Sequence, residues 1–333
     1  MARLMAEFRG GYVVRVAGGE LEAEMSGRLR YAARRGESPR PAVGDWVALE
    51  ARQEQQRALV HYVLPRRTKL SRKIAGHGVS EQVIAANVDL VFVMTSLDRD
   101  LNLRRLERYL TVVGESGARA VIVLSKADLS AGDPGLAVVA VEGVAPGVPV
   151  YLESAVSGLG LEELRTCLTD DVTAALLGSS GVGKSTLVNR WLGFEKQAVA
   201  DLRHIGKGRH TTSHRELVLL PGGGLVIDTP GMREIGLLAE DSEGLAETFP
   251  DVELLAAGCH FGDCTHGNEP GCAAREAVSE GRLPEERLRS YLKLRREIAG
   301  AEAAGVERER AQTPGRRPWG LGALTRGRRR TGR

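Results

Sequence analysis

The most constraining stretch of this sequence is a glycine-rich loop between an apolar run and an amphipathic run. Residues 178–185 read GSSGVGKS and fit the phosphate-binding pattern G-x-x-x-x-G-K-[ST] at every fixed position. The apolar residues 172–177 predict a buried strand before the loop, and residues 186–192 predict a helix after it. Glycines at such a junction let backbone N–H groups turn inward around a phosphate. The alternative, a glycine-rich turn that binds nothing, does not explain this context.

The pattern assigns a role to each position of the loop. We expect Lys184 to reach the β and γ phosphates, as a catalytic residue, and Ser185 to hold Mg²⁺. The other positions would line the phosphates: Gly178, Ser179, Ser180, Gly181, Val182, Gly183 and Thr186.

A second motif, at the end of another apolar run, predicts which base is bound. Residues 125–128 (SKAD) match the guanine-recognition pattern [NTS]-K-x-D, and residues 153–155 (ESA) match the short loop that accompanies it. The carboxylate of Asp128 can accept from N1–H and the 2-amino group of guanine, a pair that adenine lacks, while Lys126 lays its aliphatic stem along the base. A surface turn is the alternative. The predicted GTP site includes Ser125, Lys126, Ala127, Asp128, Ser154 and Ala155.

Two further segments predict contacts to Mg²⁺ and the γ-phosphate. Residues 228–231 (DTPG) match D-x-x-G, so Asp228 would hold Mg²⁺ and the Gly231 N–H would sense the γ-phosphate. The polar residues 208–213 suit a switch loop in which Thr212 closes on Mg²⁺, with Thr211 as the alternative.

The residue after D-x-x-G bears on the chemical step. Many GTPases have a glutamine there that orients water, but this chain has Met232. We therefore expect slow intrinsic hydrolysis. His210 is the candidate water-positioning residue; the alternative is that it only shapes its loop.

The order of these motifs predicts a circularly permuted domain. The guanine motif comes first, at residue 125, the phosphate loop follows at 178 and D-x-x-G at 228, with no second K-x-D downstream. Alternating strands and helices predict a parallel, doubly wound α/β sheet. The strands are expected at residues 88–94, 120–124, 149–152, 172–177, 215–220 and 225–227, and the helices at 103–113, 161–168 and 186–192.

The first 68 residues predict a small β-barrel of the oligonucleotide-binding (OB) type. Five short strands are expected at residues 11–16, 21–23, 27–31, 43–49 and 58–60. Three aromatic side chains could stack on bases or belong to the core: Tyr12, Tyr31 and Trp46. Arginines on the connections favour RNA as a ligand: Arg28, Arg30, Arg34, Arg35 and Arg40.

The C-terminal part predicts a structural metal site followed by a basic tail. Cys259, Cys264, His266 and Cys272 offer three thiolates and one imidazole, which favours a closed tetrahedral Zn²⁺ site. Cys167 is expected to be a buried small residue and His260 a bystander. A charged helix is predicted over residues 284–298, and the Arg-rich residues 308–333 are expected to be disordered.

Composition places the chain among soluble proteins. It has 333 residues, 42% hydrophobic content and a net charge of +3. Since it contains no apolar run of about 18 residues, neither a signal peptide nor a membrane span is expected. Clustered cysteines suit a reducing compartment, so we expect a cytoplasmic protein with no membrane partner.

The motifs resemble the RsgA family (YjeQ, YloQ) of circularly permuted bacterial GTPases. The similarity covers nearly the whole chain and includes residues 85–89 (AANVD), 208–212 (GRHTT), 264–266 (CTH) and 269–272 (EPGC). It implies an OB domain (1–68), a GTPase domain (69–237), a mostly helical zinc domain (238–300) and a basic tail (301–333). It also implies a late-acting maturation factor that binds the 30S subunit and its 16S rRNA, here expected to be a monomer. Ser125 departs from the family's commoner Asn.

Two other functions fit the same motifs. One is a GTP-gated RNA-binding module with negligible hydrolysis, against which the intact Lys184, Ser185 and Asp228 argue. The other is a GTPase for tRNA modification or metal delivery. Stimulation of GTP turnover by 30S subunits would separate the ribosome maturation factor from the GTPase for tRNA modification or metal delivery.

Overall fold

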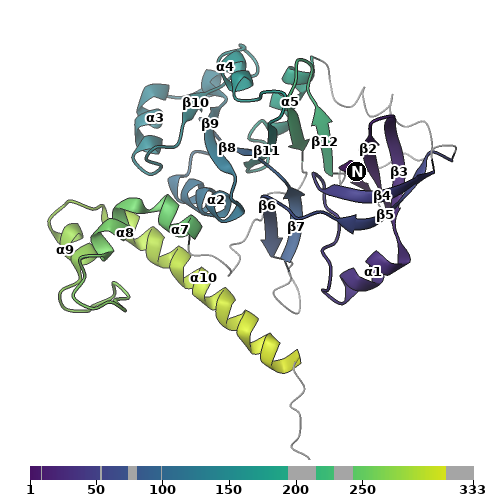
Figure 1. Ribbon diagram of the computed structural model, residues 1–333. Coiled ribbons are helices and arrows are strands. Elements are labelled where there is room, and N and C mark those ends of the chain that lie inside the picture. The colour runs from purple at the N-terminus through teal and green to yellow at the C-terminus, as the bar shows by residue number, and fades with distance from the viewer. Residues whose placement is uncertain are drawn as a thin grey trace, which may run out of the picture.

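The computed structural model describes residues 1–8, 10–52, 55–73, 81–98, 100–193, 215–228 and 243–312. It shows an N-terminal barrel, an α/β domain in the middle and a helical region at the C-terminal end (Figure 1). The expected multidomain architecture is therefore confirmed.

The N-terminal barrel is closed by five strands. These are β1 (Ala2–Phe8), β2 (Gly11–Val16), β3 (Gly19–Met25), β4 (Trp46–Arg52) and β5 (Arg57–Val63). They run in the order β1-β2-β3-β5-β4, and β4 pairs back onto β1. Alternate residues such as Leu4, Val14 and Val60 point inward and are fully buried.

One predicted barrel strand was wrong. Residues 27–31 belong to helix α1 (Gly27–Arg34), because the Ser26 hydroxyl caps its first turn by accepting from the Leu29 N–H at 3.2 Å. Leu29 is the one buried residue of this helix. The helix therefore packs on the barrel through a single apolar side chain, whereas a barrel strand would bury every second residue. The fifth strand is instead β1, which sequence analysis missed.

The central sheet is parallel, as predicted. Strands β10 (Val150–Leu152), β9 (Arg119–Ser125), β8 (Leu90–Ser96), β11 (Thr173–Gly178) and β13 (Leu225–Asp228) lie in that order, and β12 (Arg215–Leu219) is antiparallel beside β13. Every residue of β8 and β11 is buried, which is why both strands read as continuous apolar runs.

Helices cover both faces of this sheet (Figure 1). Side chains of α2 (Leu103–Ser116) and α3 (Pro134–Glu142) share one hydrophobic core, and those of α4 (Leu161–Thr166) and α5 (Lys184–Leu192) share the other. Helix α3 was not predicted. It starts with Pro134 in its first turn, and the Asp133 carboxylate caps it by accepting from the Gly135 N–H at 2.8 Å.

The barrel and the central sheet are joined by main-chain pairing. Strand β12 pairs antiparallel with β1, and the hairpin of β6 (Lys69–Lys73) and β7 (Glu81–Ala86) lies between the two domains (Figure 1). This hairpin was not among the strands predicted from the sequence. The backbone of Gly44, with φ +92°, lies against the end of β7. An added Cβ at Gly44 would lie only 2.1 Å from the Ala86 carbonyl oxygen, so this close contact requires glycine.

The C-terminal helices pack on α2. They are α7 (Glu243–Thr248), α8 (Pro250–Ala256), α9 (Ala273–Ser279) and α10 (Glu285–Gln312). The buried Arg287 guanidinium is 2.8 Å from both Glu107 of α2 and Asp251 of α8, and it stacks over the Phe249 ring at 4.3 Å. This network fixes the C-terminal helices to the central domain.

Helix α10 is longer than predicted. It continues to Gln312, past the expected end near residue 298 and the expected start of the tail at 301. The added residues are rich in Ala, Glu and Arg, which are strong helix formers. Among the described residues, no helix combines the length and apolar character needed to cross a bilayer.

Candidate nucleotide site and metal centre

The predicted nucleotide-binding residues gather at the carboxyl edge of the central sheet. Strands β9, β8, β11 and β13 end there side by side, at Ser125, Ser96, Gly178 and Asp228. Ser96 pairs with Ser125, and Gly178 pairs with Met94 of the same central strand β8. This is the edge at which doubly wound sheets bind their ligands.

The glycine-rich loop has the backbone needed to surround a phosphate. Gly181 and Gly183 have φ values of +75° and +110°, which side chains with a Cβ rarely adopt. A Cβ on Gly178 would lie 2.4 Å from the Met94 carbonyl oxygen. Helix α5 begins at Lys184 without a side-chain cap, so its first N–H groups face the loop.

The lysine of this loop lies across its entrance. Lys184 Nζ donates to the carbonyl oxygens of Gly178 and Ser179 at 2.8 and 2.7 Å. Three positions of the pattern are exposed, as is Thr186 directly after it: Ser180, Gly181 and Ser185. The Lys184 ammonium and the N-terminus of α5 thus place positive charge beside these exposed residues.

The guanine motif and its companion loop contact each other directly. Ser154 Oγ donates to Asp128 Oδ1 at 2.6 Å, and the Ala127 N–H donates to the Glu153 carbonyl oxygen at 3.0 Å. Asp128 itself is exposed, so its carboxylate can accept further hydrogen bonds. Ser154 fixes the direction in which that carboxylate points.

Ser125 connects the guanine motif to the phosphate loop. It is fully buried, and its hydroxyl donates to the Val182 carbonyl oxygen at 2.6 Å. Lys126, with φ +55°, turns the chain outward immediately after it. A serine is therefore long enough to hold the two motifs together at this position.

Glu153 begins the ESA loop that accompanies the guanine motif, but no role was predicted for its side chain. Its side chain is 2% exposed, and its Oε1 has no hydrogen-bond partner among the described residues. Burial, reinforced by the nearby Asp128 carboxylate, raises its pKa to about 7. An acid whose pKa lies near neutrality therefore stands beside Asp128 of the guanine motif.

The loop after β8 also reaches this site and was missed. It contains Asp98, 2.7 Å from Lys126 Nζ, and Asp100, which accepts a hydrogen bond from Ser179 Oγ. The only sequence signal was a pair of acids after a buried strand in the middle of the sheet. That signal is weak because such turns are often acidic for solubility.

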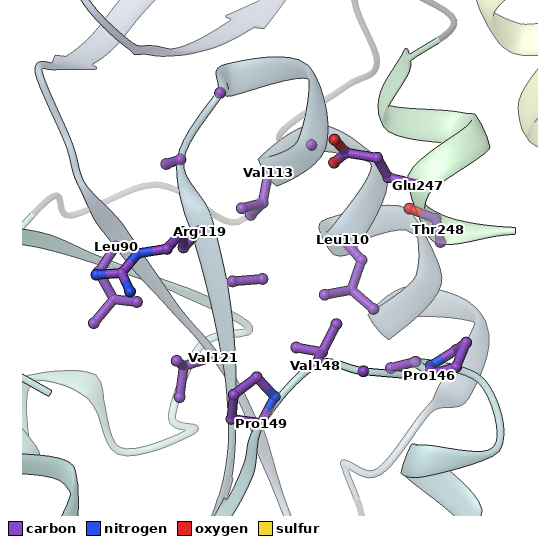
Figure 2. Close-up of a pocket in the computed structure, with 16 residues that line it drawn as sticks. Leu90, Leu110, Val113, Arg119, Val121, Pro146, Val148, Pro149, Glu247 and Thr248 are labelled. Atoms are coloured by element: carbon purple, nitrogen blue, oxygen red, sulfur yellow. The ribbon is translucent and has the colours of Figure 1, made fainter. Parts of the chain in front are cut away.

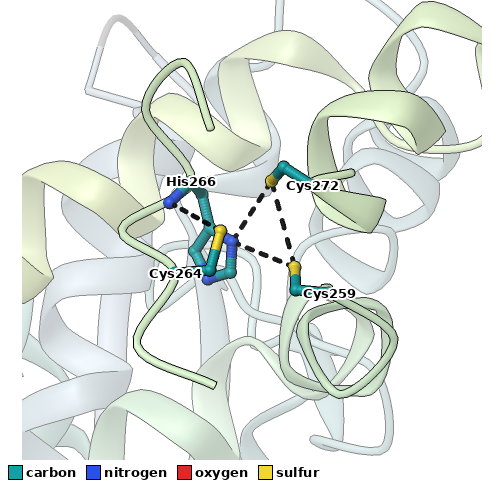
Figure 3. A group of neighbouring side chains, drawn as sticks. All are labelled: Cys259, Cys264, His266 and Cys272. Carbon is teal, nitrogen blue, oxygen red and sulfur yellow. Dashed lines mark hydrogen bonds between the residues drawn. The ribbon is translucent and has the colours of Figure 1, made fainter. Parts of the chain in front are cut away.

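Four metal-ligating side chains meet in the C-terminal region (Figure 3). The ligand atoms of Cys259, Cys264, His266 and Cys272 all lie within 4.8 Å of one another. The Nδ1 of His266 is 3.6 Å from Cys259 Sγ and 3.4 Å from Cys272 Sγ, and these two sulfurs are 3.9 Å apart. The group could hold a metal ion, as the spacing predicted.

The surroundings of this cluster support metal ligation. Burial lowers the pKa of His266 and keeps the imidazole neutral, as a metal ligand must be. Arg275 and Arg295 donate to the carbonyl oxygens of His266 and Cys264 at 3.0 and 3.3 Å and hold the ligand loop. His260 is exposed and contacts the Phe261 ring edge to face, outside the cluster.

Several predicted residues cannot be placed. His210, Thr211, Thr212, Gly231 and Met232 lie outside the described residues, as does the side chain of Asp228. Cys167, expected to be buried, is half-buried: it follows the last turn of the short helix α4 and packs at the margin of the core, with Sγ 3.8 Å from the Tyr151 hydroxyl.

A cavity of about 470 Å³ lies between the central sheet and helices α2 and α7 (Figure 2). Leu90 and Val121 line it near the amino ends of their strands, together with Leu110 of α2 and Thr248 of α7. It is mainly apolar and contains none of the motif residues.

Known proteins match this chain along most of its length. A family model described as RsgA GTPase matches residues 63–238. A small ribosomal subunit biogenesis GTPase RsgA from Opitutus terrae is 50% identical over 309 residues, covering 90% of this chain and 84% of the relative. The protein of that name from Methanosarcina acetivorans is 49% identical over 287 residues, covering 86% of this chain and 76% of the relative.

Two solved structures share the fold. YjeQ from Thermotoga maritima superposes with a TM-score of 0.66 at 26% identity, covering 90% of this chain and 98% of its own. YloQ, a circularly permuted GTPase, gives a TM-score of 0.63 at 24% identity, covering 90% and 94%.

Proposed function

Because this chain belongs to the RsgA GTPase family and is a GTPase, we propose that it matures the small ribosomal subunit. It binds the 30S particle and its 16S rRNA, hydrolyses GTP there and leaves. The observation that carries this proposal is the similarity to small ribosomal subunit biogenesis GTPases over about nine-tenths of the chain. Neither tRNA modification nor metal delivery has comparable support.

The proposed GTP site spans the edges of β9 and β11. The 2.6 Å bond from Ser154 holds the Asp128 carboxylate toward N1–H and the 2-amino group of guanine. Because GTP brings its own negative charge, Lys184 exchanges its two carbonyl acceptors for the β and γ phosphates.

Magnesium fits this site because Ser185 is exposed at the first turn of α5 and Asp228 ends the neighbouring strand β13. When bound, the ion neutralises charge on the β and γ phosphates. Ser185, Asp228 and Thr212 are its proposed ligands, with Thr211 as the alternative to Thr212. Gly231 would sense the γ-phosphate through its N–H, and His210 would position the attacking water.

We propose that the C-terminal cluster holds one structural Zn²⁺. Bonds of about 2.3 Å to sulfur and about 2.0 Å to nitrogen keep tetrahedral ligand atoms about 3.5–3.8 Å apart. The observed separations of 3.9, 3.6 and 3.4 Å agree with such a shell. Three thiolates and one imidazole leave no open position for catalysis.

RNA binding is proposed for the arginine-rich surface of the barrel. Tyr31 on α1 is 62% exposed, and the arginines near it are exposed: Arg28, Arg30, Arg34, Arg35 and Arg40. Exposed aromatics among cations suit single-stranded RNA. Tyr12 is buried and belongs to the core, whereas Trp46 is 41% exposed with Arg3 over its ring at 5.0 Å.

The direct test is co-sedimentation of the full chain with purified 30S subunits, 50S subunits or tRNA, with GDP or a non-hydrolysable GTP analogue. Binding to 30S alone, stronger with the analogue, is expected. Equal binding to all three would contradict the assignment. Sedimentation of the free chain checks the proposed monomer, and its recovery in the soluble fraction of bacterial cells checks the proposed cytoplasmic location.

A further inference from the structure

Two carboxylates stand where an anionic ligand should be bound. Asp98 and Asp100 follow β8, the strand between the guanine motif on β9 and the phosphate loop on β11. Negative charges near phosphates oppose GTP binding. Both acids are nevertheless in contact with residues of the proposed site, one on each side.

Asp98 contacts the base-reading side. Its Oδ2 is 2.7 Å from Lys126 Nζ, and its Oδ1 accepts from Ser96 Oγ at 2.8 Å. The lysine and aspartate side chains are each about one-third exposed, at 31% and 32%. Because Ser96 is the last residue of β8, its hydrogen bond anchors the Asp98 carboxylate to the sheet. Asp98 in turn holds the ammonium end of Lys126, whose aliphatic chain is expected to cover the base.

Asp100 contacts the phosphate side. Its Oδ2 accepts from the hydroxyl of Ser179 in the glycine-rich loop, and its Oδ1 is 2.8 Å from the Arg105 guanidinium. Its carbonyl oxygen accepts from Thr95 Oγ1 at 3.2 Å. Arg105 is fixed in turn, because its N–H donates to the Asn102 side chain that caps α2. Asp100 is therefore tied both to β8, through Thr95, and to α2, through Arg105.

We propose that Asp98 and Asp100, which lie between β8 and α2, position the GTP site from between its two halves. Asp98 orients Lys126 against guanine, and Asp100 holds Ser179 and with it the curvature of the phosphate loop. Both are positioning residues. The inference rests on the proposed nucleotide site.

Charge and positioning predict opposite results, which makes the proposal testable. If the acids only contribute negative charge, removing either one tightens GDP binding. If they position Lys126 and Ser179, truncating them weakens it. Asparagine separates the two effects, because it keeps an oxygen acceptor and removes the charge.

The experiment is calorimetric titration of the full-length, Mg²⁺-containing protein with GDP. For Asp98→Ala and Asp100→Ala we expect about tenfold weaker binding, the loss typical of one hydrogen bond to a charged group. Asp100→Asn should bind GDP with an affinity close to that of wild type. The GDP affinity of Asp98→Asn should lie between those of wild type and Asp98→Ala. Glu142→Ala, an exposed acid at the end of α3, is the matched control and should leave affinity unchanged.

A double-mutant cycle and steady-state kinetics exclude a purely structural effect. Ser179→Ala should weaken binding as Asp100→Ala does, and the double variant should be no worse than Asp100→Ala, since both single variants remove the same Ser179–Asp100 hydrogen bond. In Asp98→Ala the KM for GTP should rise while kcat at saturating GTP stays near wild type.

Tighter or unchanged GDP binding in both alanine variants would overturn the inference, as would additive losses in the cycle. Failure of the wild-type protein to bind GDP would instead refute the proposed site. The two failures are thus distinguishable.

Discussion

Replacing Glu153 with glutamine should make the protein more stable at alkaline pH and leave it nearly unchanged at acidic pH. The carboxyl is 2% exposed, and burial beside Asp128 moves its pKa from 4.5 to about 7. The folded state therefore holds this proton more tightly than the unfolded chain does. Glutamine keeps the shape and cannot ionise.

The sign and size follow from proton linkage. Below pH 4.5 both states are protonated and the acid carries no penalty. Between pH 4.5 and 7 the unfolded chain releases a proton that the folded state keeps, so the unfolding free energy of wild type falls by about 2–3 kcal/mol between pH 5 and pH 8 and levels off once the buried carboxyl ionises above pH 7. The Gln variant lacks this loss.

The assay is urea unfolding of nucleotide-free wild type and Glu153→Gln at pH 5, 6, 7 and 8, followed by tryptophan fluorescence. Trp191 lies 5.6 Å from Phe92 in the core of the GTPase domain and reports its unfolding. Glu142→Gln, which removes an exposed acid, is the control and should not change the pH dependence. A constant difference between wild type and Glu153→Gln at every pH would refute the reasoning.

Three other substitutions test separate parts of the structure. Cys264→Ala should release the metal and unfold the C-terminal ligand loop while GDP binding persists, because structural zinc stabilises the fold around it; stoichiometric zinc by atomic absorption after dialysis would contradict the ligand set. Arg287→Ala should lower the unfolding free energy by about 1–3 kcal/mol, since buried Glu107 loses its most buried partner and keeps only the partly exposed Arg104 and the Ser290 hydroxyl; replacing Glu107 with leucine as well should recover part of the loss, and denaturant unfolding of both variants measures this. Asp128→Asn should shift preference from guanine toward xanthine nucleotide, whose 2-oxo group suits an amide donor, and retained selectivity in competition binding would place the base site elsewhere.

Sequence reasoning succeeded where one physical cause dominated. Strands β8 and β11 are buried on both faces, so their apolar runs could mean little else. The Cys₃His spacing predicted a cluster that the fold assembles from one loop and the start of α9. Permuted order could be read directly from residues 125, 178 and 228.

Sequence reasoning failed where a single local hydrogen bond favours a helix over a strand. One hydroxyl, that of Ser26, makes residues 27–34 a helix. The strand β1 alternates too weakly to be recognised, yet β2, β4 and β12 all pair with it.

The same limit applies at the site. Asp98 and Asp100 became site residues only because β8 lies between β9 and β11, a neighbour relation that depends on tertiary topology. Glu153 acquires its raised pKa from burial, which a three-residue pattern does not reveal.

GTP turnover of the full chain, measured alone and with purified 30S subunits, tests whether the small subunit stimulates hydrolysis at this site. We expect slow hydrolysis alone and a marked increase in kcat with 30S, absent with 50S subunits or tRNA. An Asp128→Asn variant that loses the stimulated rate with GTP would confirm that the turnover belongs to this site. Turnover that 30S subunits leave unchanged, under conditions in which the protein binds them, would contradict the claim.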